Sequence, residues 1–112
     1  MTTKITWEDF EKIEMRVGTI IEVNDFPKAR KPAYQLTIDF GSEIGIKKSS
    51  AQITRRYSKE ALLNRQVVAV VNFPEKQIAN FKSQCLILGA IDGTDVILIQ
   101  PEASVPNGLR VG

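Results

Sequence analysis

The chain has 112 residues, of which 43% are hydrophobic and 25% are charged, a composition typical of one globular domain with a modest core. It contains no histidine and a single cysteine, Cys85, which excludes an intrachain disulfide, the usual zinc sites and the commonest general base. No apolar run approaches the roughly 20 residues of a membrane span, and the N-terminus lacks the apolar core of a signal peptide, so we expect a cytoplasmic protein.

The first predicted element is a short helix that begins after Thr6. Thr6 and Asp9 have the spacing of a capping box, and Trp7, Phe10 and Ile13 follow at helical intervals. Because a helix of this length is marginal alone, we expect its aromatic side to pack on the rest of the protein or on a second copy.

Three strands are predicted next. In the first, residues 16–26, Gly18 interrupts β-branched side chains and indicates a bulge or a bend. The second, residues 34–40, alternates apolar and polar side chains, as a strand with one buried face does. The third starts at Ile46 and is unusual, because lysines and small hydroxyl residues leave neither of its faces apolar in the middle.

A short helix and a buried strand follow. Ser58 has the character of an N-cap, and Asn64 is expected to end the helix in the left-handed conformation. Residues 67–71 are continuously apolar, which favours a strand that is buried on both faces.

A hairpin is predicted near the C-terminus, where residues 86–91 and 96–99 flank an Asp-Gly pair at 92–93 and a loop that extends to Asp95. A final turn is expected at 105–108. Five or more strands, with one short helix between the third and the fourth, predict an all-β fold: a five-stranded OB-fold barrel with a short N-terminal helix, as one domain. OB folds commonly bind oligonucleotides on an exposed strand face and its flanking loops, which would explain a third strand without an apolar face.

The positive charge is concentrated in the middle of the chain. The formal net charge is +2, but residues 28–65 carry nine basic and three acidic side chains, whereas residues 1–27 carry three and six. Two interpretations are open. The basic third strand can be a surface for an anionic ligand, or it can be a solvated strand edge on which lysines prevent aggregation.

Several segments resemble the tRNA-binding-domain family of OB folds that occur at the ends of some aminoacyl-tRNA synthetases. They are Phe10 to Gly18, Ile38 to Gly41, Gly45 to Thr54, Val71 to Pro74, Ser83 to Leu88 and Val105 to Gly108. The motifs SSAQIT and NFP are most similar to stand-alone members that act as secretion-associated chaperones. The resemblance implies a homodimer built through N- and C-terminal extensions, binding of unfolded or precursor polypeptides in SecA-dependent export, and relatives that bind tRNA structure.

The resemblance also implies a nucleic-acid-facing surface. Its residues are Lys47, Lys48, Ser50, Arg55, Arg56, Asn72, Lys76, Ser83, Gln84 and Cys85. The family often has Gly-x-x-Ser-Glu where this chain has Asn-Phe-Lys-Ser-Gln at 80–84. We expect Asn80 to replace a glycine at positive φ, and Gln84 to keep hydrogen bonding without the negative charge of glutamate.

A second candidate site is an apolar groove for extended polypeptide, formed by Phe73, Pro74, Ile78 and Phe81. The alternative is that both phenyl rings cap the barrel. Cys85 has no histidine to generate its thiolate and precedes an apolar run, so a structural thiol is favoured over a catalytic one.

The sequence therefore predicts a non-catalytic protein that binds unfolded or precursor polypeptides, with binding of tRNA or RNA structure as the alternative. No cofactor and no metal are expected. The implied partners are a second copy of the chain, precursor polypeptides, SecA and tRNA. RNA binding would weaken steeply with salt, whereas peptide binding in an apolar groove would be far less sensitive.

Overall fold

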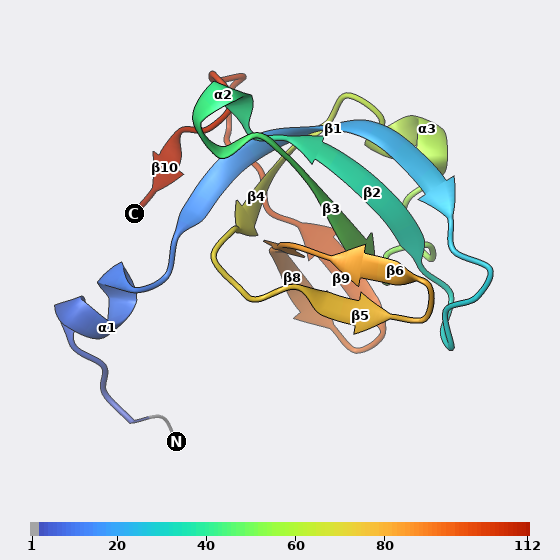
Figure 1. The fold of residues 1–112 in the computed structure, drawn as a ribbon, viewed down its shortest axis with the longest axis horizontal. Coiled ribbons are helices and arrows are strands. Elements are labelled where there is room, and N and C mark those ends of the chain that lie inside the picture. Colours follow the sequence, from blue (N-terminus) through green and yellow to red (C-terminus); the bar gives the residue numbers. More distant parts are fainter. Residues whose placement is uncertain (1–2) are drawn as a thin grey trace.

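The computed structural model describes residues 3–112, and its centre is a curled, five-stranded antiparallel sheet (Figure 1). The strands are β1 (Met15–Asp25), β2 (Tyr34–Asp39), β3 (Ile46–Ala51), β4 (Gln66–Val70) and β7 (Leu86–Ile87), in the order β3-β2-β1-β4-β7. The outer strands β3 and β7 contact each other, so the barrel is nearly closed. The short helix α3 (Lys59–Leu62) connects β3 to β4, and the predicted OB-fold barrel is confirmed.

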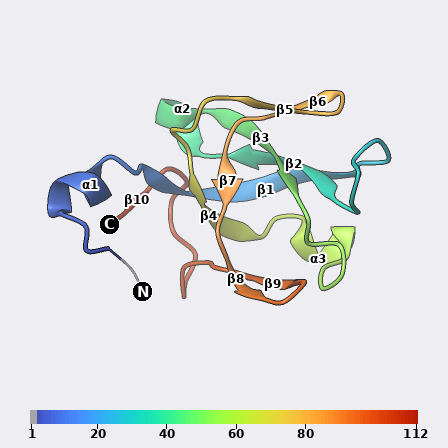
Figure 2. The same cartoon turned by 90° about the horizontal axis from the view of Figure 1, so that it is seen from below.

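Smaller elements surround the barrel. They are the helices α1 (Trp7–Glu11) and α2 (Gly41–Ile44), the strand β10 (Arg110–Val111), which pairs with β1, and the hairpins β5 (Lys76–Ile78) with β6 (Phe81–Ser83) and β8 (Gly89–Asp92) with β9 (Asp95–Leu98). Helix α1 stands away from the barrel, and the two hairpins lie on opposite sides of β7 (Figure 2). None of the helices within residues 3–112 has the length and apolar character needed to cross a membrane.

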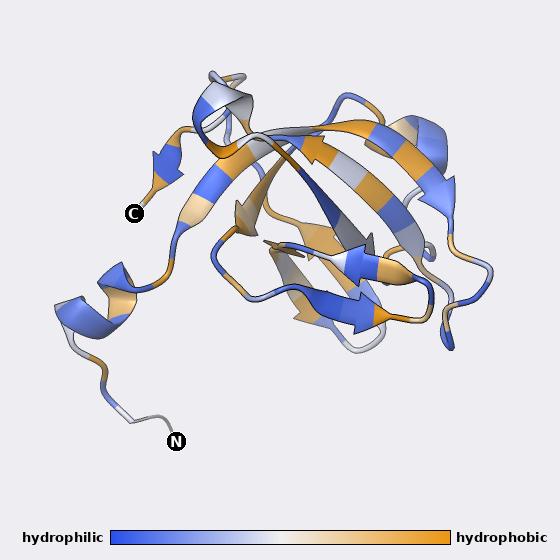
Figure 3. Cartoon of the chain, viewed as in Figure 1, coloured by the Kyte–Doolittle hydropathy of each residue, from blue (hydrophilic) through white to orange (hydrophobic). Residues whose placement is uncertain are grey.

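The core is filled by one face of β2 and by almost all of β4. Tyr34, Leu36 and Ile38 are buried and alternate with half-buried polar residues, as the sequence pattern predicts. Figure 3 shows the change of hydropathy along the ribbon of β2. Residues 67–71 are all buried, in agreement with their continuous apolar character. Gly18 allows this packing, since a Cβ at that position would lie 2.6 Å from Ile38 Cγ2. β1 pairs with β4 through its first half and with β2 through its second half, and its register with β2 shifts between Ile20 and Glu22, as at a β-bulge, just beyond Gly18.

The predicted N-caps of the two helices and the left-handed residue after the second are confirmed, whereas the first helix ends at Glu11, before Ile13, which the helical spacing includes. The Asp9 N–H donates to Thr6 Oγ1 (3.0 Å), and the Thr6 N–H donates to Asp9 Oδ2 (3.2 Å), which is the capping box. Ser58 Oγ accepts a hydrogen bond from the Ala61 N–H (3.1 Å) at the start of α3. Asn64 lies in the left-handed region with a φ of 69°, as expected after a helix.

No strand is predicted from the sequence between β4 and β7, whereas residues 76–83 form the β5–β6 hairpin, in which Ile78 pairs with Phe81 across a two-residue turn. Ala79 has a φ of 51°, and Asn80 is not among the residues with positive φ, so the expectation for Asn80 is wrong. In the type II′ turn, which two-residue hairpin loops favour, the first central residue has the positive φ, and that residue is Ala79.

The β8–β9 hairpin has a shorter turn than predicted. Asp92 pairs with Asp95, so the loop consists of Gly93 and Thr94 alone. Gly93 is the first central residue, and its φ of 62° supplies the left-handed conformation that this tight turn requires.

Candidate functional site

Gln84 closes the barrel by pairing with the free edge of β3. Its N–H donates to the Lys48 carbonyl (2.7 Å), and its Oε1 accepts from the Lys48 N–H (3.0 Å). Its Nε2 donates to a carboxylate oxygen of Glu75 (2.8 Å). A glutamate at this position could accept from Lys48 but could not donate to Glu75, so the amide suits both neighbours.

The small hydroxyl residues of β3 complete the closure. Ser49 is only 1% exposed, and its hydroxyl donates to the Cys85 carbonyl (3.0 Å). Ser83 Oγ accepts a hydrogen bond from the Ser50 N–H (3.2 Å). These bonds satisfy backbone groups at a seam where no regular ladder forms. The polar character of the third strand is therefore, in part, a requirement of barrel closure.

A small hydrophobic cluster joins the loop between β1 and β2 to the β5–β6 hairpin. Phe81 is 9% exposed, and its ring centroid lies 5.4 Å from that of Phe26, with an angle of 58° between the rings. Ala33 is buried in the same cluster, and Ala29 and Ile78 pack against it. Phe81 thus holds two loops together, which are the loops that OB folds commonly use to bind ligands.

The apolar cleft is a cavity of about 340 Å³ beside this hairpin. It is lined by Ser50, Phe73, Pro74, Lys76, Ile78, Ser83, Cys85 and Leu86. Phe73 is 54% exposed and Leu86 is 49% exposed, so a concave site presents apolar surface to solvent. Three of the residues predicted for polypeptide binding, Phe73, Pro74 and Ile78, lie in this one cavity.

The basic groove adjoins the apolar cleft and is larger, at about 1010 Å³. It is lined by Lys28, Ala29, Arg30, Lys31, Ala33, Ser50, Gln52, Lys76, Gln77, Ile78 and Ala79. Ser50, Lys76 and Ile78 also line the apolar cleft, so the two cavities meet along a shared wall. Among residues 3–112, the groove is lined by four cationic side chains and no carboxylate, so its electrostatic potential favours a negatively charged ligand.

Three of these cations, Lys28, Arg30 and Lys31, are not among the site residues predicted from the sequence. Their signal was present as the basic tract KARKP at 28–32. The tract counts toward the positive middle of the chain, but only the fold brings it opposite the β5–β6 hairpin, where Lys76 lies.

Arg55 and Arg56 lie instead against the β8–β9 hairpin, on the side of the barrel opposite β5 and β6 (Figure 2). Arg56 donates to both carboxylate oxygens of Asp95, with Nη2 2.6 Å from Oδ2, and Arg55 donates to the Thr94 hydroxyl. The hydrogen bond from Arg56 holds the pKa of Asp95 below its usual value. The charge of Arg56 is therefore compensated within the chain.

The remaining predicted residues have structural partners or lie on β3. Lys47 is half-buried, and Lys48 is exposed. Asn72 anchors the N-terminal segment, because its Nδ2 donates to the Lys12 carbonyl (2.7 Å) and its Oδ1 accepts from the Glu14 N–H (3.0 Å).

Cys85 is buried, although it contributes to the lining of the apolar cleft. Burial raises the pKa of its thiol to about 11, against the smaller opposing effects of Lys47 and Ser49. The thiol therefore stays protonated near neutral pH, which suits a structural residue and not a nucleophile.

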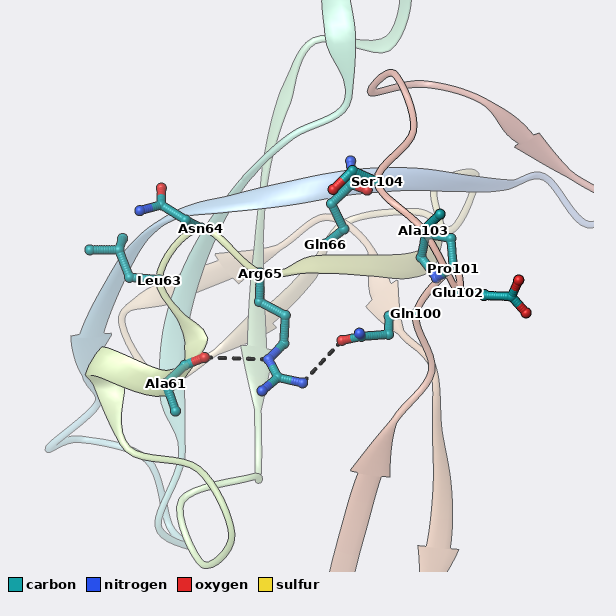
Figure 4. A pocket seen from close by; sticks show the side chains of 10 residues that line it. All are labelled: Ala61, Leu63, Asn64, Arg65, Gln66, Gln100, Pro101, Glu102, Ala103 and Ser104. Atoms are coloured by element: carbon teal, nitrogen blue, oxygen red, sulfur yellow. Dashed lines mark hydrogen bonds between the residues drawn. The ribbon is translucent and has the colours of Figure 1, made fainter.

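A further cavity, of about 400 Å³, lies between α3 and residues 100–104 (Figure 4). Arg65 crosses it, donating from Nε to the Ala61 carbonyl (3.3 Å) and from Nη1 to Gln100 Oε1 (3.0 Å). The guanidinium carbon of Arg65 lies 5.1 Å from the ring centroid of Tyr57. These contacts tie α3 to the segment after β9, and the cavity shares no lining residue with the cleft or the groove.

Known proteins are similar in sequence to this chain over nearly all of its length. The model of a family described as a tRNA binding domain matches residues 15–110. The chain is 38% identical over 107 residues to the methionine–tRNA ligase of Thermococcus onnurineus (strain NA1), a stretch that is 96% of this chain and 14% of the ligase. The chain therefore spans a small part, 14%, of the length of such curated relatives.

Two solved structures match over their whole length. The chaperone CsaA from Bacillus anthracis str. Ames is 48% identical with a TM-score of 0.93, over 98% of this chain and 100% of that chain. The CsaA chaperone protein from Picrophilus torridus is 55% identical with a TM-score of 0.91, over 97% and 100%. The match to the family model, together with the shared barrel, shows that this chain belongs to the tRNA-binding-domain family of OB folds.

Proposed function

We propose that this protein binds extended segments of unfolded or precursor polypeptides, without catalysis, in the apolar cleft. The observation that carries the proposal is the exposed ring of Phe73 in a concave site with Pro74, Ile78 and Leu86. Apolar side chains are accessible in a non-native polypeptide and hidden in a folded one, so this site would select non-native chains. The similarity to the two CsaA chaperones supports the proposal, and we extend it to protein export with SecA as a partner.

Binding of a permanently unfolded protein tests this function. We expect a labelled, reduced and alkylated α-lactalbumin to bind in a fluorescence anisotropy titration, with weak salt dependence and a negative heat-capacity change. Phe73→Ser should weaken the binding by about tenfold, because it removes apolar contact worth roughly 1–2 kcal/mol. It should leave the melting temperature unchanged, since Phe73 is half exposed.

The matched control is Leu63→Ser, which removes another exposed apolar side chain, one that is 47% exposed and lines the cavity of Arg65, outside the cleft. This variant should bind the unfolded protein as the wild type does. Equal losses in both variants, or no loss in Phe73→Ser, would contradict an assignment of polypeptide binding to the apolar cleft.

Binding of tRNA or another structured RNA is the second candidate, and the basic groove favours it. Its four cations face a cavity without a carboxylate, and the curated relatives that match are tRNA ligases. A titration of labelled tRNA at near-physiological salt should then show binding that weakens steeply as salt rises. Arg55→Gln/Arg56→Gln in the same assay decides whether an RNA surface extends to the β8–β9 side, as the sequence predicts.

We also propose that the protein is a homodimer that forms through α1 and the neighbouring C-terminal strand. Helix α1 has no buried residue, and Ile5, Trp7 and Phe10 line an apolar hollow of about 620 Å³ on it. Trp7 is 84% exposed. A five-residue helix cannot be stable by itself, so a partner surface is needed to hold its apolar side.

A further inference from the structure

We infer that the polypeptide segments bound by this protein carry acidic residues beside their apolar residues, with the apolar part in the apolar cleft and the acidic flank in the basic groove. The inference rests on the proposed polypeptide function, and it names the chemistry of the segment that the site prefers. Three observations carry it: the shared wall of the two cavities, the charge of the groove and the absence of aromatic side chains from the groove lining.

The two cavities form one path. Ser50, Lys76 and Ile78 line both of them, so a ligand that leaves the apolar cleft past Ile78 enters the basic groove. Their volumes of about 340 Å³ and 1010 Å³ are in the range of sites for a drug-sized or larger ligand. An extended polypeptide is long enough to occupy both at once, because it gains about 3.3 Å in length with each residue.

The cations of the groove are available to a ligand. Elsewhere in the molecule, cations pair closely with carboxylates: Arg56 with Asp95 at 2.6 Å, and Lys59 with Asp25 at 3.0 Å. The groove cations Lys28, Arg30, Lys31 and Lys76 take part in none of the salt bridges found within residues 3–112. A carboxylate-bearing segment would therefore complement the groove without displacing an internal partner.

The lining of the groove favours a peptide over a single-stranded nucleic acid. OB folds and other single-strand binders hold bases by stacking them on aromatic side chains, and no aromatic side chain lines the groove. The lining combines flexible cations with alanine, serine and glutamine. Such a surface can neutralise carboxylates and donate hydrogen bonds to a peptide backbone, but it provides no platform for bases.

The two walls of the groove are joined before a ligand arrives. The contact between Phe26 and Phe81 fixes the loop of residues 26–33 against the β5–β6 hairpin. This packing brings the cations to one cavity in the free protein. Ligand binding therefore does not have to order the loop, and the free energy of binding is not reduced by that entropy cost.

Three labelled peptides with the same apolar segment test the inference. The segment is followed by a run of aspartates in the first peptide, glutamines in the second and lysines in the third. At low salt, we expect the aspartate peptide to bind about tenfold more tightly than the glutamine peptide, since several exposed ion pairs act together. The lysine peptide should bind most weakly, and added salt should bring the three affinities together.

Two matched variants assign the effect to the groove. Lys28→Gln/Lys31→Gln removes two of the four groove cations and should reduce the preference for aspartate while leaving the affinity for the glutamine peptide unchanged. Lys4→Gln/Lys12→Gln removes the same charge from the N-terminal segment, outside the groove, and should keep the preference.

The outcomes separate the inference from the proposed function. Equal binding of the aspartate and glutamine peptides overturns the inference and leaves polypeptide binding intact. If no peptide binds, the proposed function fails with it. If an RNA oligonucleotide binds through Lys28 and Lys31 more tightly than the aspartate peptide, the groove is assigned to nucleic acid and the inference is overturned.

Discussion

Two phenylalanines that are eight positions apart illustrate how differently similar residues are used. Phe73 is 54% exposed in the apolar cleft, whereas Phe81 is 9% exposed and packs on Phe26. From the sequence, both rings are candidates for ligand contact or for a barrel cap. In the structure, Phe73 is available to a ligand, and Phe81 supports the walls of the basic groove.

Phe81→Ala should therefore affect stability where Phe73→Ser does not. We expect a loss on the order of 3 kcal/mol in the free energy of unfolding, because the ring is buried in a small cluster that has little else to fill the space. The measurement is urea unfolding of both variants beside the wild type. Comparable, small losses in the two variants would show that Phe81 does not hold the loops together.

Cys85 makes the stability depend on pH in the alkaline range. Its pKa is raised from the ordinary 9.0 to about 11, so the folded protein binds more protons than the unfolded chain between these values. The stabilising contribution is complete below about pH 9 and is lost as the pH rises through 11, with a total on the order of 2 kcal/mol. Urea unfolding across this interval should show a steeper decline for the wild type than for Cys85→Ala, and parallel curves would contradict the assignment.

At the scale of elements, the barrel is closed by side chains at the seam between β3 and residues 83–85. Ser49, Ser83 and Gln84 supply bonds that a ladder would make elsewhere. The polar side chains of β3 therefore have two compatible roles, one on each face of the strand. One face completes the barrel, and the other borders the two cavities.

Gln84→Glu tests this seam. The introduced carboxylate can accept from the Lys48 N–H, but it would face Glu75, which now accepts a hydrogen bond from the Gln84 amide at 2.8 Å. We expect a loss on the order of 1 kcal/mol near neutral pH from the like charges, measured by urea unfolding.

The compensating change is Glu75→Gln. In the Gln84→Glu/Glu75→Gln double variant, the new carboxylate at position 84 again has an amide donor beside it, at position 75. Most of the lost stability should therefore return. A double-mutant cycle measures the coupling free energy between the two positions. Additive losses in the cycle would show that the contact between residues 75 and 84 does not stabilise the seam.

At the scale of the whole molecule, the exposed apolar side of α1 bears on assembly. The chain has one tryptophan, Trp7, and it is 84% exposed in a single copy. A dimer through α1 would bury the indole, so its fluorescence emission should move to shorter wavelength as the protein concentration rises.

Sedimentation velocity checks the same assembly independently. The wild type should sediment as a dimer and Trp7→Ser as a monomer, whereas Ile91→Ser, which removes an exposed side chain far from α1 in sequence, should remain a dimer. A wild type that sediments as a monomer at all concentrations would contradict assembly through α1.

The sequence by itself determined the features that depend on neighbours a few positions away. The capping box at Thr6, the alternation of β2, the left-handed Asn64 and the continuous burial of residues 67–71 all follow from such patterns, and together they identify the barrel. The exclusion of disulfides and of histidine chemistry needs only the composition.

Tertiary structure alone decided which side chains share a cavity and which charges are compensated. Arg56 is 39 positions from Asp95, and Lys31 is 45 positions from Lys76, so no local pattern indicates that the first pair forms an ion pair and the second lines a groove. The physical reason is that burial and charge pairing depend on which distant segments the curled sheet brings together, whereas caps and strand periodicity depend on backbone geometry within one or two turns.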